Sequence, residues 1–213
     1  MRLPERVLEP VERISEILFG LIMALTITGA VSVTTADRLQ IRTMLIAALG
    51  CNLAWGIIDA GMYLMARLGE RGRMALVART LRETTDHETA RRMIANELPP
   101  PLDSILQQPQ LELIREKIDQ LPHAGPGLSG RDWLGALGVF ALVVLSTFPV
   151  VIPFLFIENA RWALRTSNAL AVAMLFLCGF FFARYAGLRP WTTGLLMVII
   201  GAALVGIAIA LGG

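Results

Sequence analysis

Three acidic side chains recur at a spacing that would place them on one side of a helix. Glu112, Glu116 and Asp119 stand at positions i, i+4 and i+7, and residues at this spacing share a helix face. Three carboxylates on one face repel one another unless a cation or a basic partner lies among them. The spacing therefore raises the possibility of a metal site.

An imidazole and two further acids precede this set. Glu83 and His87 are four residues apart, and Glu88 follows directly. If the two sets faced each other, they would form an oxygen-rich site with one nitrogen ligand, which suits a divalent ion such as Fe²⁺ or Mn²⁺. The simpler interpretation is an ordinary solvated face, because Arg115 and Lys117 stand beside the acids, and the spacing alone favours it.

One carboxylate stands well inside a long apolar stretch. Asp59 falls on the same helical stripe as Asn52 and Tyr63, with Met62 one turn along. An ionisable group within a membrane span is costly and usually functional, so the stripe predicts a pathway for cations or protons. An equally good alternative is that Asp59 lies near the end of its span, where it pairs with an arginine or reaches water.

A second acid stands where another apolar stretch begins. Glu16 shares a helix face with Gly20 and Met23, at i, i+4 and i+7, and we predict that Glu16 and Met23 belong to the same pathway. The alternative is an interfacial acid at a helix N-terminus, which the helix dipole favours.

The elements that must position these residues are long apolar helices. The chain of 213 residues is 55% hydrophobic, with a mean hydropathy of +0.62, and its charges are segregated from its apolar stretches. Windows of about 20 apolar residues are long enough to cross a bilayer, and in lipid they must be helical. Five windows meet this condition, at 17–35, 44–65, 133–157, 166–183 and 191–211. We expect an all-α membrane protein with five spans.

The polar stretch between the second and third windows predicts a helical insert. Helices are expected at 68–82, at 85–97 with Thr84 or Thr85 as N-cap, and at 108–120, with a break at prolines 99–101. The expected domains are 1–67 with two spans, 68–131 as the metal-binding-like insert, and 132–213 with three spans. Some 66 residues are few for an independent core, which favours a homodimer.

The basic residues predict the topology. A cytoplasmic N-terminus and insert place 15 of the 19 Lys and Arg residues on the inside, as the positive-inside rule requires. The C-terminus then lies on the opposite side. We therefore expect a multi-pass protein of the lipid bilayer with a cytoplasmic insert.

Several classes of function lack support in the sequence. The basic residues show no stripe interleaved with aromatics, so no nucleic-acid partner is expected. Cys51 and Cys178 both fall inside spans, which favours buried thiols over a disulfide or zinc site. No nucleophile set, metalloprotease motif or phosphate loop is present, and the chain has only two histidines. We therefore expect neither an enzyme nor a permanently bound cofactor.

Two patterns inside the spans concern helix packing. Pro149 and Pro153 predict a kink in the third span, with freed carbonyl groups that often line cavities. Ala202, Gly206 and Ala210 form a stripe of small residues in the fifth span, which predicts close packing against a neighbouring helix.

The layout resembles the vacuolar iron transporter family: two spans, a helical acidic insert, then three spans. Residues 15–21, SEILFGL, are similar to the opening of that family's first span, and residues 149–156, PVVIPFLF, to its Pro-rich third span. Where the family continues Asn-Asp-Gly, this chain has Ile22, Met23 and Ala24. The family's glutamate in the second span falls at Ile57.

The resemblance implies proton-coupled export of Fe²⁺ or Mn²⁺ from the cytosol by a dimer whose insert collects cations. The alternative is a protein that uses the same scaffold without transport, as a metal-sensing or interaction module. Flux measurements on the purified protein separate the two.

Overall fold

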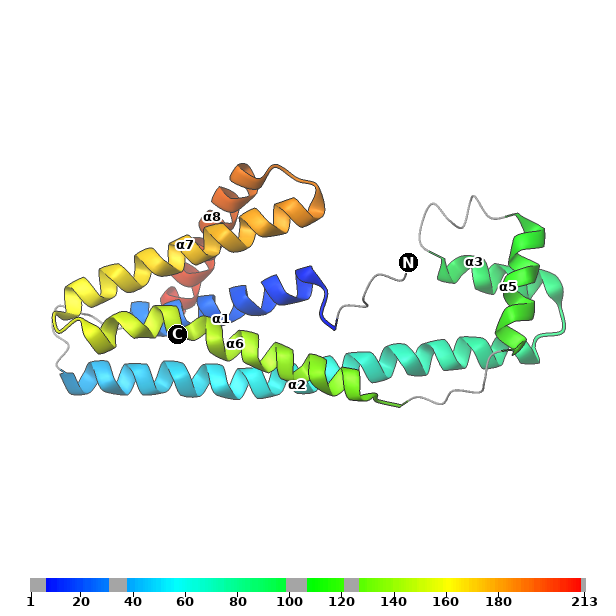
Figure 1. Ribbon diagram of the computed structural model, residues 1–213, viewed down its shortest axis with the longest axis horizontal. Coiled ribbons are helices and arrows are strands. Elements are labelled where there is room, and N and C mark those ends of the chain that lie inside the picture. Colours follow the sequence, from blue (N-terminus) through cyan, green and yellow to red (C-terminus); the bar gives the residue numbers. More distant parts are fainter. Residues whose placement is uncertain (1–6, 31–37, 99–106, 121–126, 212–213) are drawn as a thin grey trace. The chain divides into compact units, whose positions relative to one another are not determined.

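The computed structural model describes residues 7–30, 38–98, 107–120 and 127–211, and this part of the chain is helical without strands. Its helices are α1 (Pro10–Ala30), α2 (Arg38–Glu83), α3 (His87–Glu97), α5 (Gln108–Gln120), α6 (Gly130–Phe156), α7 (Ala160–Ala186) and α8 (Pro190–Ala210) (Figure 1). The prediction of an all-α chain is confirmed for these residues. The expected break at prolines 99–101 and residues 31–35 of the first apolar window lie outside them.

The chain divides into two compact units. Unit 1 comprises residues 1–63 and 130–213, and unit 2 comprises residues 64–129. Unit 1 therefore brings together α1, the first part of α2, and α6 to α8. Unit 2 contains the rest of α2 with α3 and α5.

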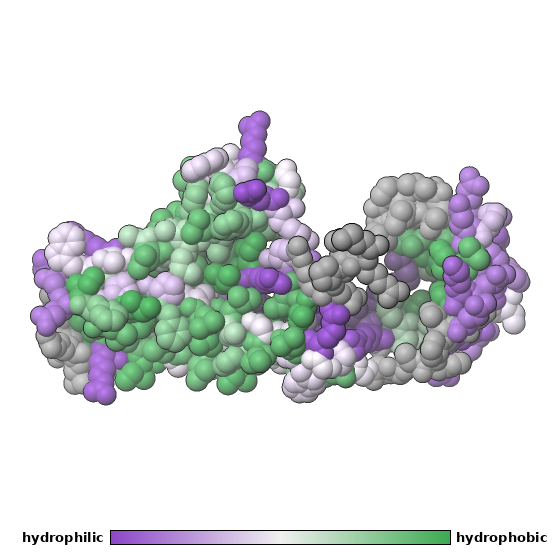
Figure 2. Space-filling view, viewed as in Figure 1, coloured by the Kyte–Doolittle hydropathy of each residue, from purple (hydrophilic) through white to green (hydrophobic). Residues whose placement is uncertain are grey.

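Four helices are long and apolar enough to cross a membrane: α2, α6, α7 and α8. Many of their large apolar side chains are exposed; Leu145, Ile199 and Ile207 are each more than half exposed. In Figure 2, hydrophobic side chains cover most of the visible face of unit 1, whereas hydrophilic side chains gather on α5. These features indicate a membrane-embedded protein. A fifth span, the side of the insert and the positions of the termini stay predictions.

Helix α1 lies at the centre of unit 1, where it contacts α6, α7 and α8. Its buried residues Leu21 and Ala24 pack with Val150 of α6 and Leu175 of α7. A second cluster joins Met44 and Leu45 of α2 to Val151 of α6. The core of unit 1 is therefore built around α1.

The α7–α8 contact differs from the sequence prediction. A Cβ at Gly201 of α8 would lie 2.8 Å from Leu175, and one at Gly194 would meet Phe176. Ala202 and Gly206, by contrast, are exposed. The predicted small-residue stripe is thus not the one that packs against α7, because Gly194 and Gly201 occupy the other face of the helix.

Helix α6 continues through both of its prolines. The hydroxyl of Ser167 in α7 donates a hydrogen bond to the carbonyl of Val150 at 2.7 Å. This bond joins α7 to α6 between the two prolines; the carbonyls that the prolines leave without an intrahelical donor are those of Leu145 and Pro149.

Unit 2 has its own small core. Leu81 of α2, Ala90 and Ile94 of α3, and Leu111 of α5 are buried together. The predicted N-cap of the second insert helix is wrong: α3 begins at His87, and Asp86 accepts hydrogen bonds from the backbone amides of Glu88 and Thr89. The carboxylate of Asp86 reaches these amides from an extended backbone, as an N-cap requires.

Candidate functional site

Asn52 joins three helices of unit 1. Its side chain is 1% exposed, and its Nδ2 donates to the carbonyl of Gly20 in α1 at 3.2 Å and to Oγ1 of Thr147 in α6 at 2.6 Å. Its Oδ1 is buried and makes no hydrogen bond to the described residues. One amide therefore links α1, α2 and α6 and still has an unused acceptor, which costs free energy in an apolar interior.

The close approach of α1 and α6 at this point requires a glycine. A Cβ on Gly20 would lie 2.6 Å from the carbonyl oxygen of Val143 and would collide with the hydroxyl of Ser146. Ser146 already donates to Val143 O at 2.8 Å, so its hydroxyl is satisfied within α6. Gly20 therefore exposes its carbonyl to Asn52 while the two helix backbones touch.

Asp59 lies about two helical turns from Asn52 on α2, and its Oδ2 is buried without a hydrogen-bond partner among the described residues. Helices α1 and α2 run in opposite directions (Figure 1), which puts Glu16 of α1 near Asp59. The charges of the two carboxylates interact, and Glu12 contributes to the same field. Two carboxylates in partly desolvated surroundings repel each other unless a proton or a cation lies between them.

Tyr63 lies one turn beyond Asp59. Its hydroxyl donates to the carbonyl of Val7 at 3.3 Å, and its ring lies where a Cβ on Gly135 of α6 would be. The tyrosine therefore packs between the start of α6 and the segment before α1. The stripe predicted on α2 does face α1 and α6 at Asn52, Asp59 and Tyr63.

The two predicted methionines are placed differently from each other. Met62 is 58% exposed, so the structure does not bring it to the face that carries Asp59. Met23 is half-buried in α1, on the turn after Gly20. Sulfur ligands therefore contribute little to the face that the carboxylates share.

In unit 2, most of the predicted metal ligands have protein partners. Glu83 pairs with Arg79 at 2.8 Å, and Glu88 pairs with Arg91 and Arg92. His87 Nδ1 lies 2.8 Å from Glu112 Oε1, and Arg115 lies 3.8 Å from the same oxygen. The His87–Glu112 contact connects α3 to α5, and the arginines compensate the acidic charge within their own helices.

The remaining two predicted ligands are Glu116 and Asp119. Glu116 is exposed, and the side chain of Asp119 lies outside the described residues. Within the described ranges, no three His, Cys, Asp or Glu side chains gather as a metal-holding group. Of the three acids on one face of α5, Glu112 has an arginine of its own helix beside it, Arg115 at a three-residue spacing, which relieves part of the expected repulsion.

The sequence analysis missed Thr147 and the role of the Gly20 carbonyl. Thr147 is fully buried, and it accepts the shorter of the two hydrogen bonds from Asn52. Its signal in the sequence is a Ser-Thr pair in the middle of an apolar window, since buried hydroxyls in membrane helices often bond across helices.

Comparison with known proteins found no matching family model and no matching curated protein.

Proposed function

We propose that this protein is a membrane transporter of divalent metal ions, Fe²⁺ or Mn²⁺, which it moves out of the cytosol in exchange for protons. Asp59 and Glu16 are the groups that take either the metal ion or a proton. Asn52 and Tyr63 border them on the same face of α2. The protein acts as a homodimer in this proposal, as the size of its insert suggests.

The observation that carries the proposal is the buried, unpartnered Oδ2 of Asp59 beside a second carboxylate. No arginine partner of Asp59 occurs among the described residues, so contact with water is the part of the alternative interpretation that stays open. A carboxylate oxygen without a donor in an apolar unit is costly unless the group is neutralised. A proton and a metal ion both neutralise it, and they compete for the same lone pairs.

Two carboxylates supply only part of a coordination shell. Fe²⁺ and Mn²⁺ accept carboxylate, carbonyl and water oxygens, so water molecules would complete the shell of an ion held by Asp59 and Glu16. Incomplete coordination suits transport, because an ion that crosses a membrane must bind weakly enough to leave again.

The test is metal flux into liposomes that enclose a metal-sensitive dye. Asp59→Asn keeps the shape of the side chain but removes the charge and the titratable proton, so we expect it to abolish flux. Glu16→Gln is expected to give an intermediate rate. Met62→Leu is the matched control on the next turn of α2, and it should transport close to the wild-type rate, since Met62 is largely exposed and does not share the face of the carboxylates.

Folding is checked by size-exclusion elution and by the helical circular dichroism signal, which must match wild type in all three variants. If Asp59→Asn transports at the wild-type rate with unchanged pH dependence, the pathway assignment is wrong. The ion pairs of unit 2 would then favour the second candidate function: a membrane scaffold whose insert serves protein interaction or metal sensing without transport.

A further inference from the structure

An apolar layer lies between Asn52 and Asp59 on the side of α2 that faces α6. Gly56 is buried one turn after Asn52. A Cβ on Gly56 would lie 3.1 Å from the ring of Phe140 and 3.3 Å from the carbonyl oxygen of the same residue. It would also lie 3.4 Å from a methyl group of Val144. The two helices therefore touch at this level, and apolar groups of α6 fill the contact.

The side of the same layer that faces α1 is also apolar. The ring of Phe19 packs edge-on against Trp55, with the ring centroids 5.5 Å apart. Phe19 lies three residues after Glu16 in α1, and Trp55 lies four residues before Asp59 in α2. Because α1 and α2 run in opposite directions (Figure 1), both rings lie one turn from the carboxylates, on the side toward Asn52.

A polar level lies on either side of this layer. Oδ2 of Asp59 is buried on one side and Oδ1 of Asn52 on the other, and neither has a hydrogen-bond partner among the described residues. Carboxylate and amide oxygens can replace part of the water shell of a cation. The side chains of Phe19, Phe140 and Trp55 carry no acceptor atom, so an ion finds no such partner between the two levels.

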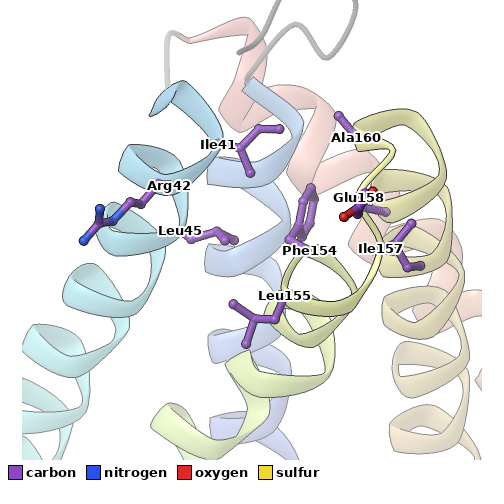
Figure 3. A pocket seen from close by; sticks show the side chains of 9 residues that line it. Ile41, Arg42, Leu45, Phe154, Leu155, Ile157, Glu158 and Ala160 are labelled. Carbon is purple, nitrogen blue, oxygen red and sulfur yellow. The ribbon is translucent and has the colours of Figure 1, made fainter. Parts of the chain in front are cut away.

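Beyond Asn52, the same stripe of α2 reaches a pocket. The pocket has a volume of about 460 Å³ and lies where α2 and α7 begin and α6 ends. Leu45, seven residues before Asn52, lines it together with Phe154 of α6 and Ala163 of α7. Figure 3 shows Leu45 and Phe154 at the pocket, with the side chain of Arg42 extending away from it. The stripe therefore leads from the carboxylates to a hollow at the opposite end of unit 1.

We propose that the apolar layer is a closed gate in this pathway, formed by Phe19, Trp55 and Phe140. The gate rests on the proposed function, because it closes the same pathway. A hydrated ion cannot enter a layer of rings without losing its water, and hydrophobic constrictions in channels gate in this way. In the closed state, an ion held at Asp59 reaches Asn52 only when the rings move apart.

The test is the labelling of a cysteine behind the gate by a small, water-soluble methanethiosulfonate reagent. Thr147→Cys places a thiol beside Asn52 at a fully buried position, and a thiol keeps weak donor and acceptor properties. Cys51→Ser removes the other thiol near the gate. Native Cys178, which is buried in α7, stays as an internal reference. Peptide mass spectrometry of the full-length protein in detergent measures the two labelling rates separately.

With the gate intact, the thiol of Thr147→Cys should react as slowly as that of Cys178. Phe140→Ala should speed its reaction about tenfold or more, because minor open states are typically populated to only about 0.1–10%. Phe140→Leu keeps the apolar bulk and should leave the thiol protected. Phe176→Ala is the matched control: its ring also packs against a glycine of a neighbouring helix, Gly194 of α8, but it belongs to the α7–α8 contact.

Phe19→Ala tests the gate from the α1 side and should act as Phe140→Ala does. Equal labelling of Thr147→Cys in the Phe19→Ala, Phe140→Ala and Phe176→Ala backgrounds overturns the gate, as does rapid labelling with all rings in place. If Cys178 becomes equally reactive in both gate variants, the change is a general loosening, which also contradicts a local gate.

The labelling and flux assays separate the two proposals. If labelling follows the expected order but wild type moves no metal ion, the barrier is supported and the transport function alone is contradicted. If wild type transports metal but Thr147→Cys is labelled rapidly with all rings in place, the gate alone is contradicted.

Discussion

Asn52 offers the sharpest test of the packing of unit 1, and we predict that Asn52→Leu does not destabilise the protein. The substitution keeps a side chain of similar size at a position that is 1% exposed. It removes the hydrogen bonds from Nδ2 to Gly20 O and to Thr147 Oγ1. It also removes the buried Oδ1, which has no partner among the described residues.

The expected magnitude follows from these opposing effects. Hydrogen bonds between membrane helices contribute on average about 0.6 kcal/mol each, so the two lost bonds cost about 1 kcal/mol. Removing a buried acceptor without a partner returns about 1–3 kcal/mol. The balance ranges from zero to about 2 kcal/mol in favour of the variant, so the unfolding free energy of Asn52→Leu should lie between the wild-type value and about 2 kcal/mol above it.

Thr147→Val should cost more in the wild-type background than in the Asn52→Leu background. With Asn52 present, the substitution removes the acceptor at 2.6 Å and leaves one amide hydrogen without a partner. In the Asn52→Leu background, no side-chain amide is left behind. A double-mutant cycle should therefore give a coupling free energy of about 1 kcal/mol.

The assay is reversible unfolding in mixed micelles, followed by tryptophan fluorescence. Trp55 lies less than one turn from Asn52 and packs edge-on against Phe19, with ring centroids 5.5 Å apart, so it reports on the α1–α2 contact. The control cycle pairs Asn52→Leu with Thr26→Val, whose hydroxyl bonds within α1, to Ile22 O. If the coupling free energy of the Asn52–Thr147 cycle exceeds that of the control cycle by less than about 0.5 kcal/mol, the reasoning is refuted. A loss above about 3 kcal/mol for Asn52→Leu would show that Oδ1 has a partner after all.

Two further predictions concern helix packing and a helix end. Gly20→Ala should destabilise the protein by about 1–3 kcal/mol, because its Cβ meets a backbone carbonyl, whereas Gly61→Ala meets nothing within 4 Å and should be neutral or stabilising in the same unfolding assay. Hydrogen bonds from Thr89 and Glu88 hold the pKa of Asp86 below its usual range. The stability that this cap gives is present above the unfolded pKa of about 3.9 and is lost as the pH falls through the lower folded pKa. Hydrogen exchange at the amides of Glu88 and Thr89, corrected for the intrinsic pH dependence, should accelerate below about pH 4. Asp86→Ala should accelerate it at every pH, whereas Thr85→Ala should not, and equal protection in both variants would contradict the assignment of the cap.

Local features of the chain predict the helices well. Apolar windows predict the helical cores of α6, α7 and α8, and the periodicity of the insert predicts a helix at 108–120, where the structure has Gln108–Gln120. These predictions succeed because hydrophobicity and helical periodicity are properties of consecutive residues. The start of α3 is the exception, since three adjacent polar residues compete for the cap and the backbone geometry selects Asp86.

Contacts between distant residues depend on the tertiary structure. Asn52 and Thr147 are 95 residues apart, and the pocket at the other end of unit 1 combines residues from α2, α6 and α7. Nothing in either segment alone indicates its partner. The sequence shows that Asn52 and Asp59 share a stripe, but only the fold shows that α1 brings Glu16 and Gly20 to that stripe.

The acids of the insert illustrate the same division. Their spacing correctly places Glu112 on a helix face, and from spacing alone a metal site and an ion-paired face are both consistent with the sequence. In the folded unit, His87 and Arg115 reach Glu112 while Glu83 and Glu88 pair with arginines.

The sequence by itself determines that the chain forms long apolar helices with a charged insert, because burial of apolar surface depends on composition along each segment. Which charges meet is decided by the tertiary structure, because electrostatic partners are selected by distance in space.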